Sequence, residues 1–123
     1  MIFKGLGLAV VTAVAFVPPA WAHHSPALYV SDAEVTLVGT ITEYNWINPH
    51  IWIYMDVEGE DGQLQEWVLE GGGPGTLTRR GWSGMSFAPG ERITAKVRPM
   101  KDGSSGALLR TLIKEDGTEF DGS

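Results

Sequence analysis

Residues 71–82 read GGGPGTLTRRGW, a run of glycine and proline followed by a short segment that can form a helix. The segment after the glycines does not alternate between apolar and polar residues, as a strand would. Thr76 can cap the start of a helix, and Gly81 can end one. We therefore expect one short helix over residues 76–80.

Five short runs of β-forming residues surround this helix. They cover residues 35–46, 50–57 and 63–70 before the helix, and residues 92–99 and 107–114 after it. The second run alternates most clearly, because Ile51, Ile53 and Met55 point one way and the residues between them point the other. In the run over residues 92–99, Ile93, Ala95 and Val97 are expected to point inward. Turn-forming residues separate the runs.

Three strands, a helix and two more strands form the order of an OB-fold-like barrel. Gly39 lies in the middle of the long first run, where a bulge or coil would let a barrel strand bend sharply. An open β-sandwich is the rival, but its usual seven strands do not fit this length. We predict an all-β, five-stranded OB-fold-like barrel with one small helix over residues 35–123, preceded by an N-terminal segment over residues 23–34.

The first residues have the pattern of a secretory signal peptide. Lys4 precedes an apolar run over residues 5–17, and Ala20 and Ala22 form the small-x-small pattern of a cleavage site. The apolar run is shorter than the ~20 residues that span a bilayer, which disfavours the alternative of a retained membrane anchor. We predict a signal peptide over residues 1–22 and a periplasmic or secreted protein with no stable membrane anchor after cleavage.

The composition excludes several classes of function. The chain has 123 residues, no cysteine and a formal net charge of −6. The length suits a single domain, and the lack of cysteine excludes disulfides, thiolate metal sites and a cysteine nucleophile. The negative charge argues against nucleic acid as a partner, because few cations are present to neutralise phosphates.

The histidines suggest a copper site. Cleavage after Ala22 would give His23 a free α-amine, which can chelate a metal together with its own imidazole. A further imidazole from His24 or His50 would complete the planar nitrogen set that Cu(II) prefers. This set resembles the histidine brace of exported copper carriers and oxidative polysaccharide-cleaving enzymes. The alternatives are a solvated histidine pair and a hydrogen bond from His50 to a turn carbonyl.

Aromatic residues form a second candidate site. His50, Trp52 and Tyr54 lie at every second position of one predicted strand, and Tyr44 and Trp46 end the strand before it. We expect these rings, Tyr44 included, on the outer face of an OB-fold-like barrel, where they can stack on a sugar or an amphipathic small molecule. The alternative is that they pack beneath the N-terminal segment or against the end of the helix.

Familiar catalytic patterns are missing. Glu66 and Glu70 would lie about 13 Å apart on one strand, too far for a glycosidase carboxylate pair, so we interpret both as part of a solvated face. The chain has no G-x-S-x-G motif, and its glycine-rich stretch lacks the Gly-Lys-Ser/Thr ending of a phosphate loop. We therefore expect no catalytic apparatus, with an oxidative copper enzyme as the alternative.

Four motifs resemble a family of small exported bacterial proteins that is described only as a domain of unknown function. They are His23-His24-Ser25, VTLVGTIT over residues 35–42, WINPH over residues 46–50 and RRGW over residues 79–82. The resemblance implies a periplasmic, barrel-like protein and no particular activity.

Together these patterns predict an exported binding protein, with copper handling as the sharpest hypothesis. A module that binds sugars or small molecules on its aromatic face is one alternative. Another is an accessory subunit that docks on an unknown periplasmic protein through an exposed apolar patch.

Overall fold

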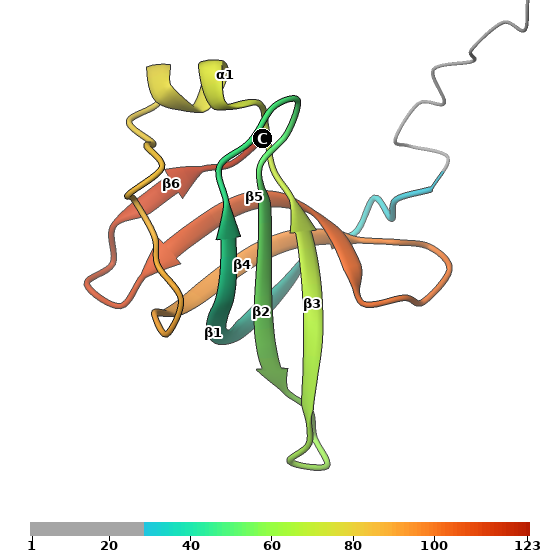
Figure 1. Cartoon of the computed structure of the whole chain (residues 1–123). Helices are drawn as coiled ribbons and strands as arrows, with labels where there is room; N and C mark the ends of the chain where they lie inside the picture. Colours follow the sequence, from blue (N-terminus) through green and yellow to red (C-terminus); the bar gives the residue numbers. More distant parts are fainter. Residues whose placement is uncertain (1–28) are drawn as a thin grey trace, which may run out of the picture.

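The computed structural model describes residues 29–123, which form six strands and one short helix (Figure 1). The predicted signal peptide over residues 1–22, with His23 and His24, lies outside the described residues. The elements in chain order are β1 (Val35–Asn45), β2 (Trp52–Glu58), β3 (Leu64–Glu70), α1 (Pro74–Arg79), β4 (Arg92–Pro99), β5 (Gly106–Lys114) and β6 (Glu119–Asp121).

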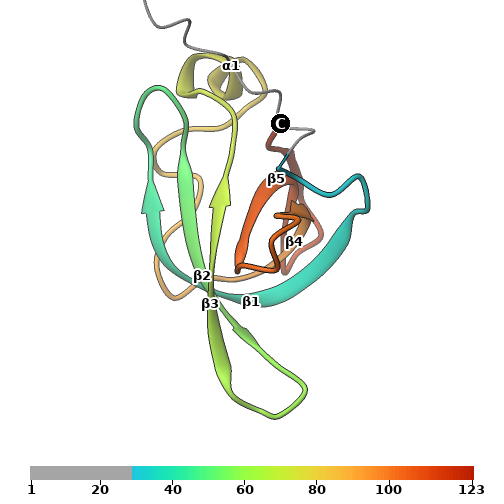
Figure 2. The same ribbon diagram turned by 90° about the vertical axis from the view of Figure 1, so that its right-hand side faces the viewer.

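The strands close into a barrel because β1 is long enough to pair on both sides. Its first half pairs with β4 and its second half with β2, both antiparallel. Figure 2 shows the long curve of β1. The strand order is β3-β2-β1-β4-β5-β6, and a parallel pairing of β3 with β5 closes the five main strands. The predicted five-stranded barrel with its small helix is confirmed.

The bend in β1 has two local causes. Gly39 lies against β2 so closely that an added Cβ would be 2.1 Å from the backbone oxygen of Asp56. Further along, the register passes from Ile41 opposite Met55 to Glu43 opposite Tyr54, so one residue of β1 is bulged out. A bulge increases the local twist, which helps a sheet to curl.

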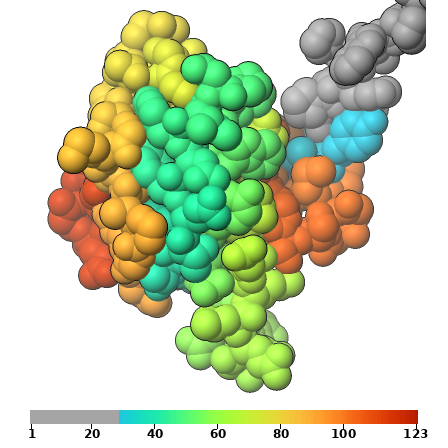
Figure 3. Space-filling model, viewed as in Figure 1, coloured from blue at the N-terminus to red at the C-terminus, as the bar shows by residue number. Residues whose placement is uncertain are grey.

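The side chains predicted to point inward form the core. Ile51, Ile53 and Met55 are fully buried, as are the inward residues of β4. The hairpin between β2 and β3 carries exposed polar and acidic residues and projects beyond the barrel (Figure 3). The segments in which apolar residues alternate with polar ones are thus the segments that form the closed barrel.

The helix begins two residues earlier than predicted. Pro74 occupies its first turn and Gly73 is the N-cap, with no side-chain cap, so the expected capping by Thr76 is wrong. Proline fits this position because the first helical N–H groups have no partner within the helix. Gly81 follows the helix with a φ of 89°, as expected of a glycine that ends a helix. The side chain of Leu77 is fully buried, so this side of α1 packs on the barrel.

Three aromatic rings pack together in the core beside β6. Trp82, Phe87 and Phe120 have ring centroids 5.0–5.3 Å apart, and the Trp82 indole donates a hydrogen bond of 2.8 Å to the backbone oxygen of Asp121. Phe120 lies in β6, a strand that we did not predict from the sequence. A strand of three residues with one apolar side chain is too short to show alternation in the sequence. Its position is fixed by the contacts with Trp82 and Phe87. Among residues 29–123, no helix has the length and apolar character needed to cross a membrane.

Candidate functional site

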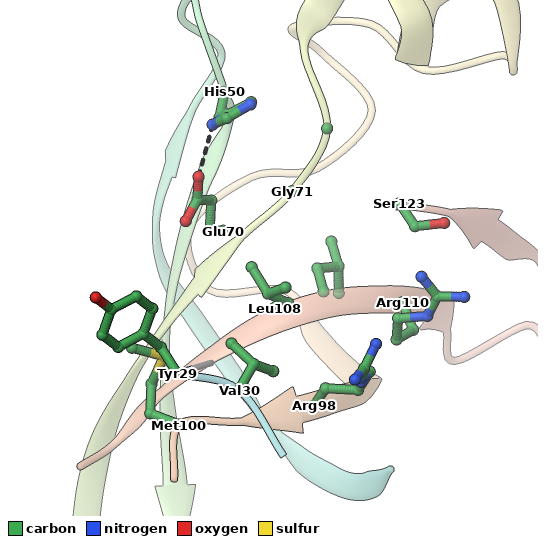
Figure 4. Close-up of a pocket in the computed structure, with 13 residues that line it drawn as sticks. Tyr29, Val30, His50, Glu70, Gly71, Arg98, Met100, Leu108, Arg110 and Ser123 are labelled. Atoms are coloured by element: carbon green, nitrogen blue, oxygen red, sulfur yellow. Dashed lines mark ion pairs between the residues drawn. The ribbon is translucent and has the colours of Figure 1, made fainter. Parts of the chain in front are cut away.

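A cavity of about 420 Å³ lies where β3, β5 and β4 meet the segment before β1 (Figure 4). The strand register explains which side chains meet there. Glu70 of β3 pairs with Leu108 of β5, and Leu108 pairs in turn with Arg98 of β4. These three residues line the cavity. The parallel pairing that closes the barrel therefore also builds this site.

The segment before β1 forms one side of the cavity. Val30 makes an isolated β-bridge with Met100, and the Ser31 N–H donates a hydrogen bond of 2.8 Å to the Pro99 oxygen. Tyr29 and Val30 both line the cavity. The described part of the chain therefore begins at this site.

The side chains of His50 and Glu70 are in hydrogen-bond contact at the opposite side of the cavity. His50 Nδ1 lies 2.6 Å from Glu70 Oε1, with the two side chains 49% and 31% exposed (Figure 4). Glu70 is the cross-strand partner of Trp52, two residues after His50, so β-sheet pairing brings the carboxylate to the imidazole. A neutral imidazole that donates from Nδ1 keeps the lone pair of Nε2 as an acceptor or metal ligand. Our interpretation of Glu70 as part of a solvated face missed this contact.

Two arginines line the cavity beyond Leu108. Arg98 is oriented by its Nε donating 2.8 Å to the Ser31 oxygen and by its Nη2 donating 2.9 Å to Asp32 Oδ1. Arg110 is bulged out of β5, because the register passes from Leu109 to Thr111 without it. A bulge re-aims the side chain that it carries, and the side chain of Arg110 lines the cavity.

The charge of Arg110 also affects the last residues of the chain. Hydrogen bonds from the Ser123 backbone and hydroxyl lower the pKa of the Asp121 carboxyl, and the charges of Arg80 and Arg110 add to this effect. The cavity thus has a cationic side at Arg98 and Arg110 and a His50–Glu70 pair at its other side.

The four candidate aromatic residues do not share one face. Tyr44 pairs with the buried Ile53, so its ring points inward, and the prediction that it faces outward is wrong. The bulge after Ile41 shifts the alternation of β1 by one residue. Trp52 and Tyr54 alternate with Ile53 and lie on the outer face of β2, partly buried.

Tyr44 and Trp46 instead pack on the segment after the helix. The Tyr44 ring lies 5.9 Å from Phe87 and 6.3 Å from Trp46, and its hydroxyl donates 2.6 Å to the Ser83 oxygen. Gly84 lies against the Trp46 ring. This is the packing against the helix end that the sequence left open as an alternative.

Burial raises the pKa of the Tyr44 phenol above its ordinary value. Below about pH 10 the phenol is protonated in the folded and unfolded chains alike, but above it the unfolded chain loses the proton first. We therefore predict that the free energy of unfolding falls as the pH rises above about 10, and falls less steeply in Tyr44→Phe. Urea unfolding at several alkaline pH values measures both slopes. Equal slopes would contradict the prediction.

Of the three histidines of the predicted copper site, the structure describes one. His50 lines the cavity, whereas His23 and His24 lie outside residues 29–123. Within that range, no group of three histidine, cysteine or acidic side chains is arranged to hold a metal ion. Arg98 and Arg110 were missed, because only the strand register brings them to His50 and Glu70.

The fold and the cavity define a small OB-fold-like barrel with a surface cavity at its closing strands. The chain belongs to a family described as a family of unknown function, DUF6152, whose model matches residues 10–110. The resemblance to a family of unknown function is thereby confirmed. No curated protein and no solved structure matches the chain.

Proposed function

We propose that this protein is an exported binding protein that coordinates Cu(II) through His23, His24 and His50. The observation that carries the proposal is the contact of 2.6 Å between His50 Nδ1 and Glu70 Oε1. Metal-binding histidines commonly donate their second ring N–H to a carboxylate, which orients the ring and makes it a stronger ligand. Nε2 of His50 is then the atom available to copper.

The length of the N-terminal segment is compatible with this site. Tyr29 and His50 line the same cavity, and His23 precedes Tyr29 by only six residues. Six extended residues span about 20 Å, which is longer than a cavity of this volume is wide. A segment of this length is long enough for His23 and His24 to reach the His50 imidazole, as the proposal requires.

The donor set suits copper better than the hard cations. Removal of residues 1–22 would supply an α-amine and up to three imidazoles, and Cu(II) has the highest affinity of the divalent first-row metals for such nitrogen sites. Because residues 29–123 hold no three-residue metal group of their own, the proposal requires the N-terminal histidines. Metal binding and signal cleavage are thus coupled in this proposal.

The test is a Cu(II) titration of protein that begins at His23, compared with the same protein carrying an extra N-terminal methionine. We expect submicromolar binding only for the authentic terminus. Electron paramagnetic resonance should show a tetragonal site that loses one nitrogen ligand in His50→Ala. Glu70→Gln should weaken binding about 10- to 100-fold, as loss of an orienting carboxylate does.

Glu66→Gln is the matched control, because Glu66 is an exposed carboxylate on the same strand outside the cavity. It removes the same charge and should leave the copper affinity unchanged. Mass spectrometry of exported protein must find a mature chain starting at His23. A different start, or copper binding that is insensitive to His50→Ala and Glu70→Gln alike, would overturn the proposal.

The alternative of sugar binding on an aromatic face loses support, since only Trp52 and Tyr54 of the four rings lie on the outer face. Within residues 29–123, no contact singles out one surface patch as the docking surface of an accessory subunit. Copper coordination is therefore the function that we put forward.

A further inference from the structure

We propose that the cavity beside β5 binds a small carboxylate with an apolar body, held between Arg98 and Arg110. This inference concerns different side chains from the copper proposal and does not depend on it. It rests on three features of the described residues: the apolar lining, the two guanidinium groups and the pairing of the acidic side chains nearby.

Apolar side chains line most of the cavity. Val30, Met100, Leu108 and Leu109 come from three separate segments and meet there because of the β-bridge at Met100 and the pairing of β4 with β5. Val30 and Leu109 are buried, so this surface continues into the body of the protein. A volume of about 420 Å³ falls in the range of small-molecule sites. Such a lining favours a ligand with an apolar body over a sugar or a polyphosphate.

The two arginines that line the cavity favour a negatively charged ligand. In a chain of net charge −6, two arginines line this one cavity. Arg98 is held in place by Ser31 and Asp32, and Asp32 is 93% exposed, where solvent screens its charge. Arg110 lies near enough to Asp121 to lower the pKa of its carboxyl, but that carboxylate is ion-paired with Arg80 at 3.2 Å. The Arg110 guanidinium itself makes no hydrogen bond or ion pair within residues 29–123, so its donors are available to a ligand.

Glu70 is the acidic side chain that lines the cavity, and it does not oppose the preference for an anionic ligand. Glu70 is engaged by His50 at the other side of Leu108, away from the arginines (Figure 4). Guanidinium groups bind carboxylates through two parallel hydrogen bonds, which gives both affinity and orientation. The cavity therefore fits an anion whose carboxylate meets the arginines and whose apolar part lies on Leu108 and Met100.

Octanoate is the probe, and octanol and octylamine are its neutral and cationic counterparts. The exported protein is treated with a chelator to remove copper, and binding is followed by calorimetry and by amide chemical shifts. We expect octanoate to bind at least about tenfold more tightly than octanol and to shift the amides of Leu108 and Arg110. Octylamine should bind most weakly.

Arg110→Gln should weaken octanoate binding about tenfold or more while leaving copper binding unchanged. Arg92→Gln is the matched control, because Arg92 is an exposed arginine at the opposite end of β4 and outside this cavity. It should not change octanoate affinity. Equal binding of octanoate and octanol, an equal loss in both variants, or no octanoate binding at millimolar concentration would each overturn the inference.

Discussion

Gly39→Ala is expected to lower the free energy of unfolding by about 3 kcal/mol or more, or to prevent folding. A Cβ at this position would lie 2.1 Å from the backbone oxygen of Asp56 and 3.0 Å from Met55 Cε. The Met55 side chain can adjust, but the Asp56 oxygen belongs to the paired strand and cannot move without disturbing the ladder. The strain therefore falls on the pairing of β1 with β2.

Urea unfolding followed by tryptophan fluorescence measures this effect. Gly75→Ala is the control, because Gly75 lies in α1 with nothing within 4 Å of an added Cβ. It should leave stability unchanged or raise it by up to about 1 kcal/mol. A Gly39→Ala protein as stable as the parent would show that β1 and β2 are not so closely packed.

Trp82→Ala is expected to cost about 3–5 kcal/mol, the usual loss when a buried tryptophan is truncated. Trp82 is 2% exposed and packs on Phe87 and Phe120. Its indole N–H is also a hydrogen-bond donor to the Asp121 oxygen, so the substitution leaves a cavity and an unpaired acceptor next to β6. Both losses should loosen β6 from β5.

Trp82→Phe separates the two effects. It keeps an aromatic ring but removes the donor, and we expect a smaller loss than for alanine. Hydrogen exchange of the Gly122 amide, which donates to the Arg110 oxygen, reports directly on attachment of the tail. Unchanged protection in Trp82→Ala would contradict the role that we give to this contact.

Much of the barrel could be predicted because each strand carries its own alternation. Ile51, Ile53 and Met55 are all inward, as their spacing indicated, and a helix lies between the third and fourth strands. The face of the sheet on which Tyr44 lies could not be predicted. The bulge after Ile41 adds one residue to β1, and no local sequence pattern marks its position. One extra residue moves every later side chain of that strand to the opposite face.

The candidate site was predicted only at His50. Its partner Glu70 was interpreted as part of a solvated face, and Arg98 and Arg110 drew no attention. These residues come from separate parts of the sequence, and they meet because β3 and β5 pair in parallel and because β5 is bulged at Arg110. Neither the parallel register nor the bulge has a local pattern that would reveal it.

The sequence by itself determined which residues of β2 and β4 point inward, the order of the main elements and the single histidine of the described site. Alternation is a property of neighbouring residues, so it can be read along the chain. Only the tertiary structure decided that Glu70 faces His50 and that two arginines line an apolar cavity. Those contacts follow from pairing between distant strands, which depends on how the whole barrel closes.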